Sequence, residues 1–324
     1  MIVVDLPLNY QKRNLKEKIY KLVLLISNSE LLTKGSTALI FKIGGMFSIY
    51  FFHFFLAKFA GAEANGIFST FFTLLSIITV FSILGLDTFL LKRLADFNSK
   101  QQWGDLKNTY KNAMCIVLII SVSLSILLYV LFANGFLDFY KQSDIVYYLI
   151  FAIIPFSVLH INAEGFRAIK NIKVFSFFKN FSIFGISAIA LFFINDSNEN
   201  IGVSAFTFSV IFLAVLSVIL WLKTMFKKHS LTEETISVSV MIRESFPMFL
   251  SGSLFLLMSW VDILMLGNFN SQMDVGIYTI ALKLSGLTAL ILFAINTILG
   301  PKISELYHHK KMDLLAETVQ ISAK

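Results

Sequence analysis

The sequence predicts an all-helical integral membrane protein, a polytopic bundle of about eight transmembrane helices. Three observations support this fold class. The chain of 324 residues is 56% hydrophobic and only 15% charged, whereas soluble domains contain about 45–50% apolar and about 25% charged residues. Its apolar residues form runs close to the roughly 20 residues that a helix needs to cross a bilayer. Its basic residues concentrate in every second loop.

The first 35 residues are polar and basic, and they contain the segment YQKRNLKEKIYKLVLLISNSELL. Lys alternates there with Leu, Ile and Val at helical spacing, which predicts an amphipathic helix on the inner membrane surface. A solvated tail is the alternative. The segment lacks the short apolar core of a cleavable signal peptide.

Eight apolar runs follow, and each predicts a transmembrane helix. They do not alternate apolar and polar residues as the strands of a membrane β-barrel do, so helices are the expected structure. The runs are residues 36–59, 67–91, 113–133, 146–163, 174–194, 201–222, 246–266 and 276–299. We expect residues 36–222 to form a first six-helix lobe, 223–245 to be a cytoplasmic linker, and 246–324 to begin a second lobe with two helices and a cytoplasmic connector.

The basic residues orient these helices. Of the 27 Lys and Arg residues, twenty-two lie in one set of alternate loops and the two terminal segments, whereas the opposite set holds only Lys141. Cytoplasmic loops carry such an excess of positive charge. The sequence therefore predicts a multi-pass protein of the cytoplasmic membrane with both termini in the cytoplasm. Anionic lipid of the inner leaflet, rather than nucleic acid, accounts for the net charge of +7.

The loops exclude several kinds of function. The predicted outer loops hold about 7, 12, 6 and 9 residues, which is too few for a catalytic or receptor domain. The chain contains neither a GxxxxGK[ST] phosphate-binding loop nor an HExxH zinc motif. We therefore expect no catalytic residues, no cofactor and no metal site, and we place the function inside the helix bundle.

Ionisable residues within the predicted spans are the candidate functional groups, because charge in hydrocarbon is costly. Lys42 and Asp87 lie at similar depth on consecutive helices, and so do Asp262 and Lys283. These groups are either two interhelical ion pairs or the lining of a water-filled cavity. In the cavity interpretation Lys42, Lys179 and Lys283 bind an anionic substrate, while His53, Asp87 and Asp262 carry protons or another coupling ion.

Two further features concern the fourth and fifth runs. Glu164 and Arg167 are three residues apart, which predicts an ion pair at the inner face. Lys179 has no evident partner in the sequence.

The most specific feature is a hairpin that occurs twice. The first copy is FLAKFAGAEANGIFSTFF (55–72), and the second is DILMLGNFNSQMDVGIYTIA (262–281). In each copy Gly, an aliphatic residue and an aromatic residue open the second apolar stretch. The first and second runs thus correspond to the seventh and eighth, which indicates a six-helix repeat. Internal repeats of this kind are typical of transporters, whose two halves move around a site between them.

The stretches LAKFAGAEANGIFSTFFTLLSIITVFSILGLDTFLLKRLADF (56–97) and WVDILMLGNFNSQMDVGIYTIALKLSGLTALILFAINTILGPKISEL (260–306) resemble the starts of the two lobes of the polysaccharide-biosynthesis flippases. These proteins belong to the multidrug/oligosaccharidyl-lipid/polysaccharide exporter superfamily. The segment EGFRAIKNIKVFSFFKNF (164–181) is similar to that family's connection between the fourth and fifth helices.

The resemblance implies a flippase that moves a polyprenyl diphosphate oligosaccharide, such as an O-antigen or capsule unit, across the membrane. Other polysaccharide-assembly proteins are then possible partners. The family carries about twelve to fourteen helices, so eight helices predict an incomplete second lobe. Two alternatives remain open: a multidrug or cation exporter of the same superfamily, and a membrane polysaccharide polymerase or ligase, which needs a large outer loop.

Overall fold

The elements of the computed structural model are all helices, and the part of the chain that it describes contains no strand. This confirms the predicted all-helical fold class. Five helices in that part are long and apolar enough to cross a membrane, or six when one bent helix is counted as a span. The described residues are 30–135, 143–194, 198–226, 228, 236–286 and 312–322.

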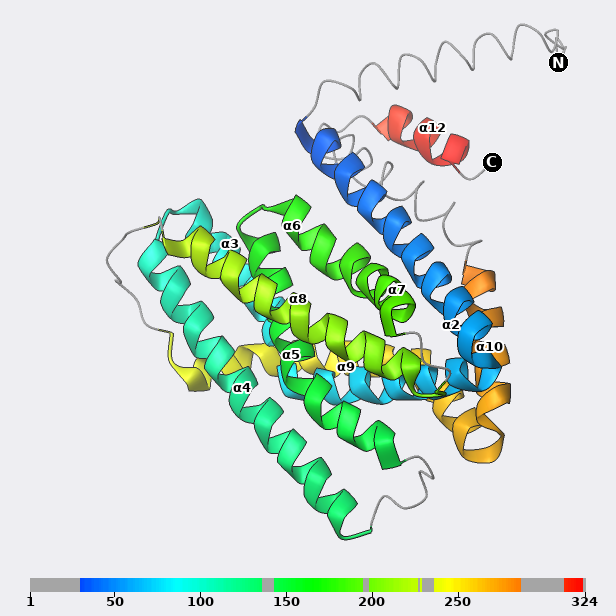
Figure 1. The fold of residues 1–324 in the computed structure, drawn as a ribbon. Coiled ribbons are helices and arrows are strands. Elements are labelled where there is room, and N and C mark those ends of the chain that lie inside the picture. The colour runs from blue at the N-terminus through cyan, green and yellow to red at the C-terminus, as the bar shows by residue number, and fades with distance from the viewer. Residues whose placement is uncertain are drawn as a thin grey trace, which may run out of the picture.

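The first helix, α2 (Glu30–Ile83), is broken at Gly61. Its apolar stretch Ile40–Ile83 is 44 residues long, about twice the length that one span requires, so it holds the first two predicted spans. Gly61 has φ 84° and ψ −178°, a conformation that is essentially restricted to glycine. Figure 1 shows the resulting bend between an N-terminal arm (30–60) and a C-terminal arm (62–83).

The predicted turn between Gly61 and Gly66 is shorter than expected. Helix resumes directly after Gly61, so Gly66 lies inside the C-terminal arm rather than in a loop. The second predicted run, 67–91, is also divided. Leu84 and Gly85 both have positive φ, and they separate α2 from α3 (Leu86–Ser99).

The third to sixth predicted runs match helices of the structure. The fifth run is unusual, because it begins as α6 (Ile172–Ser176), passes through a π-helix, η1 (Phe177–Phe181), and continues as α7 (Ser182–Ile194). The other three are α4 (Trp103–Ala133), α5 (Ser143–Ala168) and α8 (Ile201–Phe226).

The seventh run lies in α9 (Val238–Phe269), whose two halves are bent by 44°. Because α9 begins at Val238, the predicted linker 223–245 is already helical over its last eight residues. The eighth run begins in α10 (Gln272–Gly286), and the rest of it lies outside the described residues. The predicted amphipathic segment also lies outside them up to residue 29, and the predicted connector is described only at α12 (Met312–Ser322).

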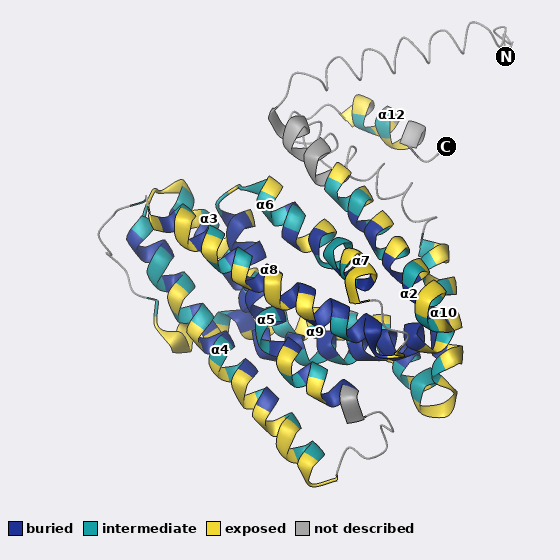
Figure 2. Ribbon diagram, viewed as in Figure 1, coloured by how far each residue is buried: buried dark blue, intermediate teal, exposed yellow. Residues whose placement is uncertain are grey.

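The helices from α2 to α8, called the N-terminal bundle below, enclose two clusters of buried apolar side chains. One surrounds Phe52, Phe68 and Phe206, and the other surrounds Phe89, Phe166 and Trp221. Figure 2 shows these buried residues on the inward faces, whereas α4 is largely exposed along its outer face. Exposed apolar side chains such as Ile119 on α4 and Met258 on α9 are expected where helices face lipid.

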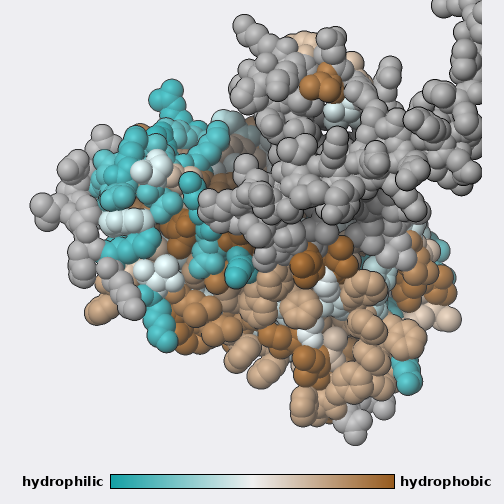
Figure 3. All heavy atoms as spheres, turned by 90° about the horizontal axis from the view of Figure 1, so that it is seen from above, coloured by the Kyte–Doolittle hydropathy of each residue, from teal (hydrophilic) through white to brown (hydrophobic). Residues whose placement is uncertain are grey.

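Hydrophilic side chains gather at one end of the bundle, around α3 and the start of α4, as Figure 3 shows. Exposed basic residues come from the loops that the sequence places on this single side, among them Lys92, Lys100, Lys111, Arg167, Lys170, Lys173, Lys223 and Arg243. The ammonium group of Lys228 also lies here, 3.4 Å from the centre of the Trp103 ring, and burial lowers the pKa of this lysine. These basic residues of one set of alternate loops thus gather at one end of the bundle, as the sequence predicts.

Candidate functional site

The two copies of the hairpin pack against each other through their glycines. A Cβ atom on Gly66 would lie 1.7 Å from the carbonyl oxygen of Gln272, and one on Gly276 would lie 2.1 Å from that of Ala62. No side chain larger than hydrogen fits at either position. The repeated Gly is therefore explained: each copy supplies one glycine to a backbone crossing between the C-terminal arm of α2 and α10, as small residues do in membrane helix pairs.

Polar contacts flank this crossing. The Thr70 hydroxyl donates to Oε1 of Gln272 at 3.1 Å. From the N-terminal arm of α2, the Tyr50 hydroxyl donates to the backbone carbonyl of Lys283. The N-terminal bundle thus meets the hairpin of α9 and α10 along a contact surface, called the seam below, which includes Tyr50, Gly66, Thr70, Gln272, Gly276 and Lys283. Lys283, a predicted substrate-binding cation, takes part in it through its backbone carbonyl.

Asp262 does not pair with Lys283. Its Oδ2 accepts a hydrogen bond of 2.6 Å from the Tyr278 hydroxyl, and its Oδ1 accepts from the Ile263 backbone. Among the described residues it forms no ion pair, so the interpretation of a hairpin ion pair is wrong at this position. The aromatic residue of the repeated motif, Tyr278, supplies the contact instead.

His53 lies three residues after Tyr50 on the N-terminal arm of α2 and is 4% exposed. Its Nδ1 is 2.7 Å from Oδ1 of Asn65, whose Nδ2 donates to the His53 carbonyl at 3.1 Å. Because the amide nitrogen already points at that carbonyl, Oδ1 can only accept, so Nδ1 of His53 carries the proton. Its Nε2 is buried and has no hydrogen-bond partner in the described residues. The contact also ties the two arms of α2 together across Gly61.

A second contact joins α3 to α9 at the hydrophilic end. The guanidinium of Arg93 binds both carboxylate oxygens of Glu244, at 2.6 and 2.8 Å. A Cβ atom on Gly85 would lie 2.5 Å from the carbonyl oxygen of Ser245, so glycine again permits close approach. A pocket of about 310 Å³ lies beside this ion pair, and Lys92 and Asp96 also line it.

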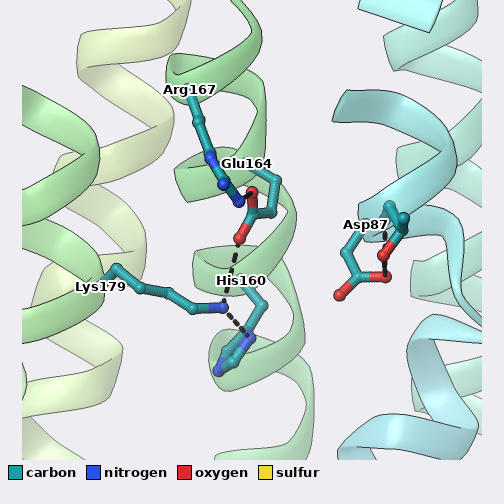
Figure 4. Close-up of polar contacts among 6 residues, drawn as sticks. Asp87, His160, Glu164, Arg167 and Lys179 are labelled. Carbon is teal, nitrogen blue, oxygen red and sulfur yellow. Dashed lines mark hydrogen bonds and ion pairs between the residues drawn. The ribbon is translucent and has the colours of Figure 1, made fainter. Parts of the chain in front are cut away.

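Lys179 has partners that the sequence did not reveal. Its ammonium group lies 3.4 Å from Oε1 of Glu164 and 3.3 Å from Nδ1 of His160, and Arg167 lies 3.3 Å from the other carboxylate oxygen. Figure 4 shows the three α5 side chains aligned along one face and Lys179 reaching them from η1. The predicted pair of Glu164 and Arg167 is confirmed, while the interpretation of Lys179 as an unpartnered cation is wrong.

Lys42 and Asp87 complete the predicted set. The helix segment after Lys42 packs against η1, because a Cβ on Gly45 would lie 2.3 Å from the carbonyl oxygen of Asn180. The segments that carry Lys42 and Lys179 are therefore neighbours. Asp87 accepts from the backbone N–H of Thr88 at 2.7 Å and forms no ion pair with a described residue, so the second predicted hairpin pair is not formed either.

Sequence reasoning missed His160 and the contact between Arg93 and Glu244. The spacing of four residues between His160 and Glu164 places both on one face of a helix, and this signal was available. The pairing of Arg93 with Glu244, 151 residues away, depends on how α9 packs and has no local signal.

An apolar groove of about 760 Å³ opens between α4, α5 and α8. It contains no charged side chain and includes Tyr129, Phe151 and Pro155 in its lining. It is therefore not a candidate for an anionic group.

Comparisons with known proteins agree with this architecture. A protein-family model described as "Polysaccharide biosynthesis protein" matches residues 32–307. Among solved structures, the chain is similar to the MATE multidrug transporter DinF-BH in complex with rhodamine 6G, with 16% identity and a TM-score of 0.61 over 92% of this chain and 70% of that one. At this identity the likeness shows the fold alone. No curated protein matches the chain.

Proposed function

Since the chain belongs to the polysaccharide biosynthesis protein family and has the fold of a membrane exporter, we propose that it is a flippase for a lipid-linked oligosaccharide. The substrate is a polyprenyl diphosphate sugar, which enters from the inner leaflet and passes its head between two lobes while its tail stays in lipid. The observation that carries this proposal is the seam between the two hairpins, where Lys283 lies. The first lobe is the N-terminal bundle, and α9 and α10 begin the second.

The chemistry of the seam suits an anionic head group. A diphosphate cannot cross about 30 Å of hydrocarbon without compensating charge. Lys283 lies on the seam itself, and Lys42 and Lys179 lie on neighbouring segments of the N-terminal bundle. We propose that these cations receive the diphosphate in turn.

The same superfamily includes exporters of cationic drugs, and this is the second candidate function. An exporter of cations needs carboxylates that are free to bind them. In the described spans, Asp262 accepts from Tyr278, Asp87 accepts from Thr88, and Glu164 lies between two cations. Lys283, by contrast, forms no ion pair with a described residue. This difference favours an anionic substrate over a cationic one.

An integral membrane polymerase or ligase is disfavoured by the hairpin geometry. Only Asn270 and Ser271 separate α9 from α10, and Gly61 alone separates the two arms of α2. Neither connection has room for the outer catalytic loop that such an enzyme needs.

The proposal places the driving force in an ion gradient or the membrane potential. Of the predicted coupling groups, His53 is supported best, because its Nε2 is buried and without a partner among the described residues. Asp87 and Asp262 remain in the proposal as weaker candidates, since each already accepts hydrogen bonds.

A binding experiment tests the proposal. The purified full chain in lipid nanodiscs should bind a polyprenyl diphosphate, and a polyprenol of the same chain length should not compete, because the charged head supplies the recognition. Rhodamine 6G, the ligand of the structural neighbour, is the control for the cation-exporter alternative. If the chain binds rhodamine 6G and does not bind the diphosphate, the cation-exporter function replaces the flippase function.

The proposed orientation, with both termini in the cytoplasm of the cell that carries the protein, has its own test. In a Cys115→Ser background, Asn134→Cys and Asn270→Cys should react with an impermeant thiol reagent added outside the cell. Lys100→Cys should react only after the membrane is permeabilised. Labelling of Lys100→Cys from outside would contradict the predicted topology.

A further inference from the structure

The cluster of charged side chains between α5 and η1 has properties that an ion pair alone does not require. The Glu164 side chain is 8% exposed and contacts two cations. The Lys179 ammonium group lies within hydrogen-bond distance of both Glu164 and the His160 ring. Lys179 also belongs to a π-helix, an irregularity that occurs often at functional sites.

The geometry fixes the protonation of His160. An ammonium group has three donors and no acceptor, so His160 Nδ1 must accept from Lys179 in the contact of 3.3 Å. A neutral imidazole that accepts at Nδ1 carries its proton at Nε2. The contact between Lys179 and His160 therefore exists only while His160 is neutral.

A proton on Nδ1 would abolish this contact. The new N–H bond removes the lone pair that accepts from Lys179, and two positive charges then face each other at the same distance. Lys179 would keep Glu164 as its partner and leave His160. Because the neighbouring Asn180 and Phe181 pack against Gly45 and Gly44 of α2, a movement of η1 reaches the arm that carries Lys42.

We propose that His160, Lys179 and Glu164 form a proton-binding site in the N-terminal bundle, in which protonation of His160 releases Lys179. The ligand is a proton taken from water and added to Nδ1. The proton raises the formal charge of the site by one, and it therefore favours an anion nearby. Lys179 is also one of the cations proposed above to receive the diphosphate, but the protonation of His160 requires no transported molecule.

Charged and titratable groups lie both on α5 and on the elements packed against it. On its own helix His160 has Glu164, which attracts a proton, and Arg167, which repels one. The elements packed against α5 carry further charged or titratable groups, among them Lys42 on α2, Asp87 on α3, Tyr110 on α4, Lys173 on α6, Lys179 on η1 and Lys223 on α8. Among the described residues, Lys179 is the one that contacts a ring nitrogen of His160.

The chain contains a matched control for this inference. His53 is also a histidine within a predicted span, but its Nδ1 faces the amide oxygen of Asn65, an acceptor. His53 must therefore carry its proton on Nδ1, whereas His160 carries it on Nε2. The same protein thus holds two span histidines with opposite predicted tautomers.

Nitrogen-15 solid-state NMR of the full chain, labelled at histidine and embedded in lipid bilayers, tests the proposal with protons as the only ligand. The His160 signals are identified by their loss in His160→Gln, and those of His53 by their loss in His53→Gln. At pH 9 His160 should show an unprotonated Nδ1 and His53 a protonated one. Stepwise acidification, followed as far as the chain stays folded, should then protonate the second nitrogen of His160 as well.

The Lys179→Met variant separates the proposed site from a histidine that merely titrates. Methionine is unbranched like lysine but lacks the terminal ammonium group, so both neutral tautomers of His160 should appear at pH 9 while the His53 signals stay unchanged. A protonated Nδ1 on His160 at pH 9 in the unmodified chain would overturn the proposal. So would a His160 that stays neutral throughout the acid titration of the folded chain, or a tautomer that Lys179→Met leaves unaltered.

Discussion

Gly66→Ala and Gly276→Ala are expected to separate the two hairpins, although each change adds only one methyl group. The added Cβ would meet a backbone carbonyl oxygen at 1.7 Å in one case and 2.1 Å in the other, and a backbone atom cannot rotate away. Overpacking of a core typically destabilises a protein by about 1–3 kcal/mol. Because the added methyl group meets backbone atoms, we expect both variants to lose stability near the upper end of this range. The free energy of unfolding in nanodiscs should fall by about that amount.

Gly252→Ala is the matched control for this prediction. Gly252 lies in α9, and a Cβ there would meet nothing within 4 Å. Because alanine is favoured over glycine in a helix by about 1 kcal/mol, this variant should be neutral or more stable. Equal stability of all three variants would show that the glycines do not form the crossing.

The rate at which a short bifunctional thiol reagent cross-links Thr70→Cys to Gln272→Cys, in a Cys115→Ser background, reports the same contact directly. In the native chain Oγ1 of Thr70 lies 3.1 Å from Oε1 of Gln272, and the reagent spans the length that the shorter Cys side chain loses. The rate should fall at least several-fold when Gly66→Ala is added, and it should stay unchanged when Gly252→Ala is added.

Glu164→Gln is expected to destabilise the N-terminal bundle, because it leaves the cations Lys179 and Arg167 without the carboxylate between them. Breaking a buried ion pair costs about 3–5 kcal/mol, whereas exposed pairs contribute about 0–1 kcal/mol. The Glu164 side chain is 8% exposed but Lys179 is 32% exposed, so the loss of unfolding free energy should fall between these limits.

A double-mutant cycle checks the cause. The variant that combines Glu164→Gln with Lys179→Met should lose less stability than the sum of the two single variants, since the second change removes the unpaired cation. Asp96→Asn, which breaks the exposed pair with Lys100, should cost less than about 1 kcal/mol. Additive losses in the cycle would show that the pair does not stabilise the bundle.

Hydropathy was sufficient to predict where helices lie in the described part of the chain, because a membrane span must satisfy its backbone internally and must be long enough to cross the bilayer. The second predicted run is divided into two helices, and most of the eighth lies outside the described residues. The sequence did not predict the residues at which these helices break. Gly61 and Gly85 divide helices where the sequence offered several small or polar residues. A Cβ on Gly85 would meet the Ser245 carbonyl oxygen, whereas one on Gly61 would meet nothing within 4 Å, so only the break at Gly85 is explained by a packed neighbour.

The sequence identified the hairpins and the ionisable residues of the candidate site, but it did not predict which side chains contact one another. The repeated Gly66 and Gly276 pointed to the correct hairpins, since symmetry between copies is a property of the sequence alone. Depth along a helix suggested that Asp262 would meet Lys283, but depth does not specify which face of the helix a side chain occupies. The Tyr278 hydroxyl reaches Asp262 instead.

Binding of a polyprenyl diphosphate to the Lys283→Gln variant tests the central claim most directly. If the seam between the hairpins receives an anionic head group, Lys283→Gln should weaken binding several-fold, and Lys283→Arg should restore most of it. Lys58→Gln, which changes an exposed lysine of the same membrane region, should bind as the unmodified chain does. Undiminished binding by Lys283→Gln, or equal binding of the uncharged polyprenol, would contradict the account.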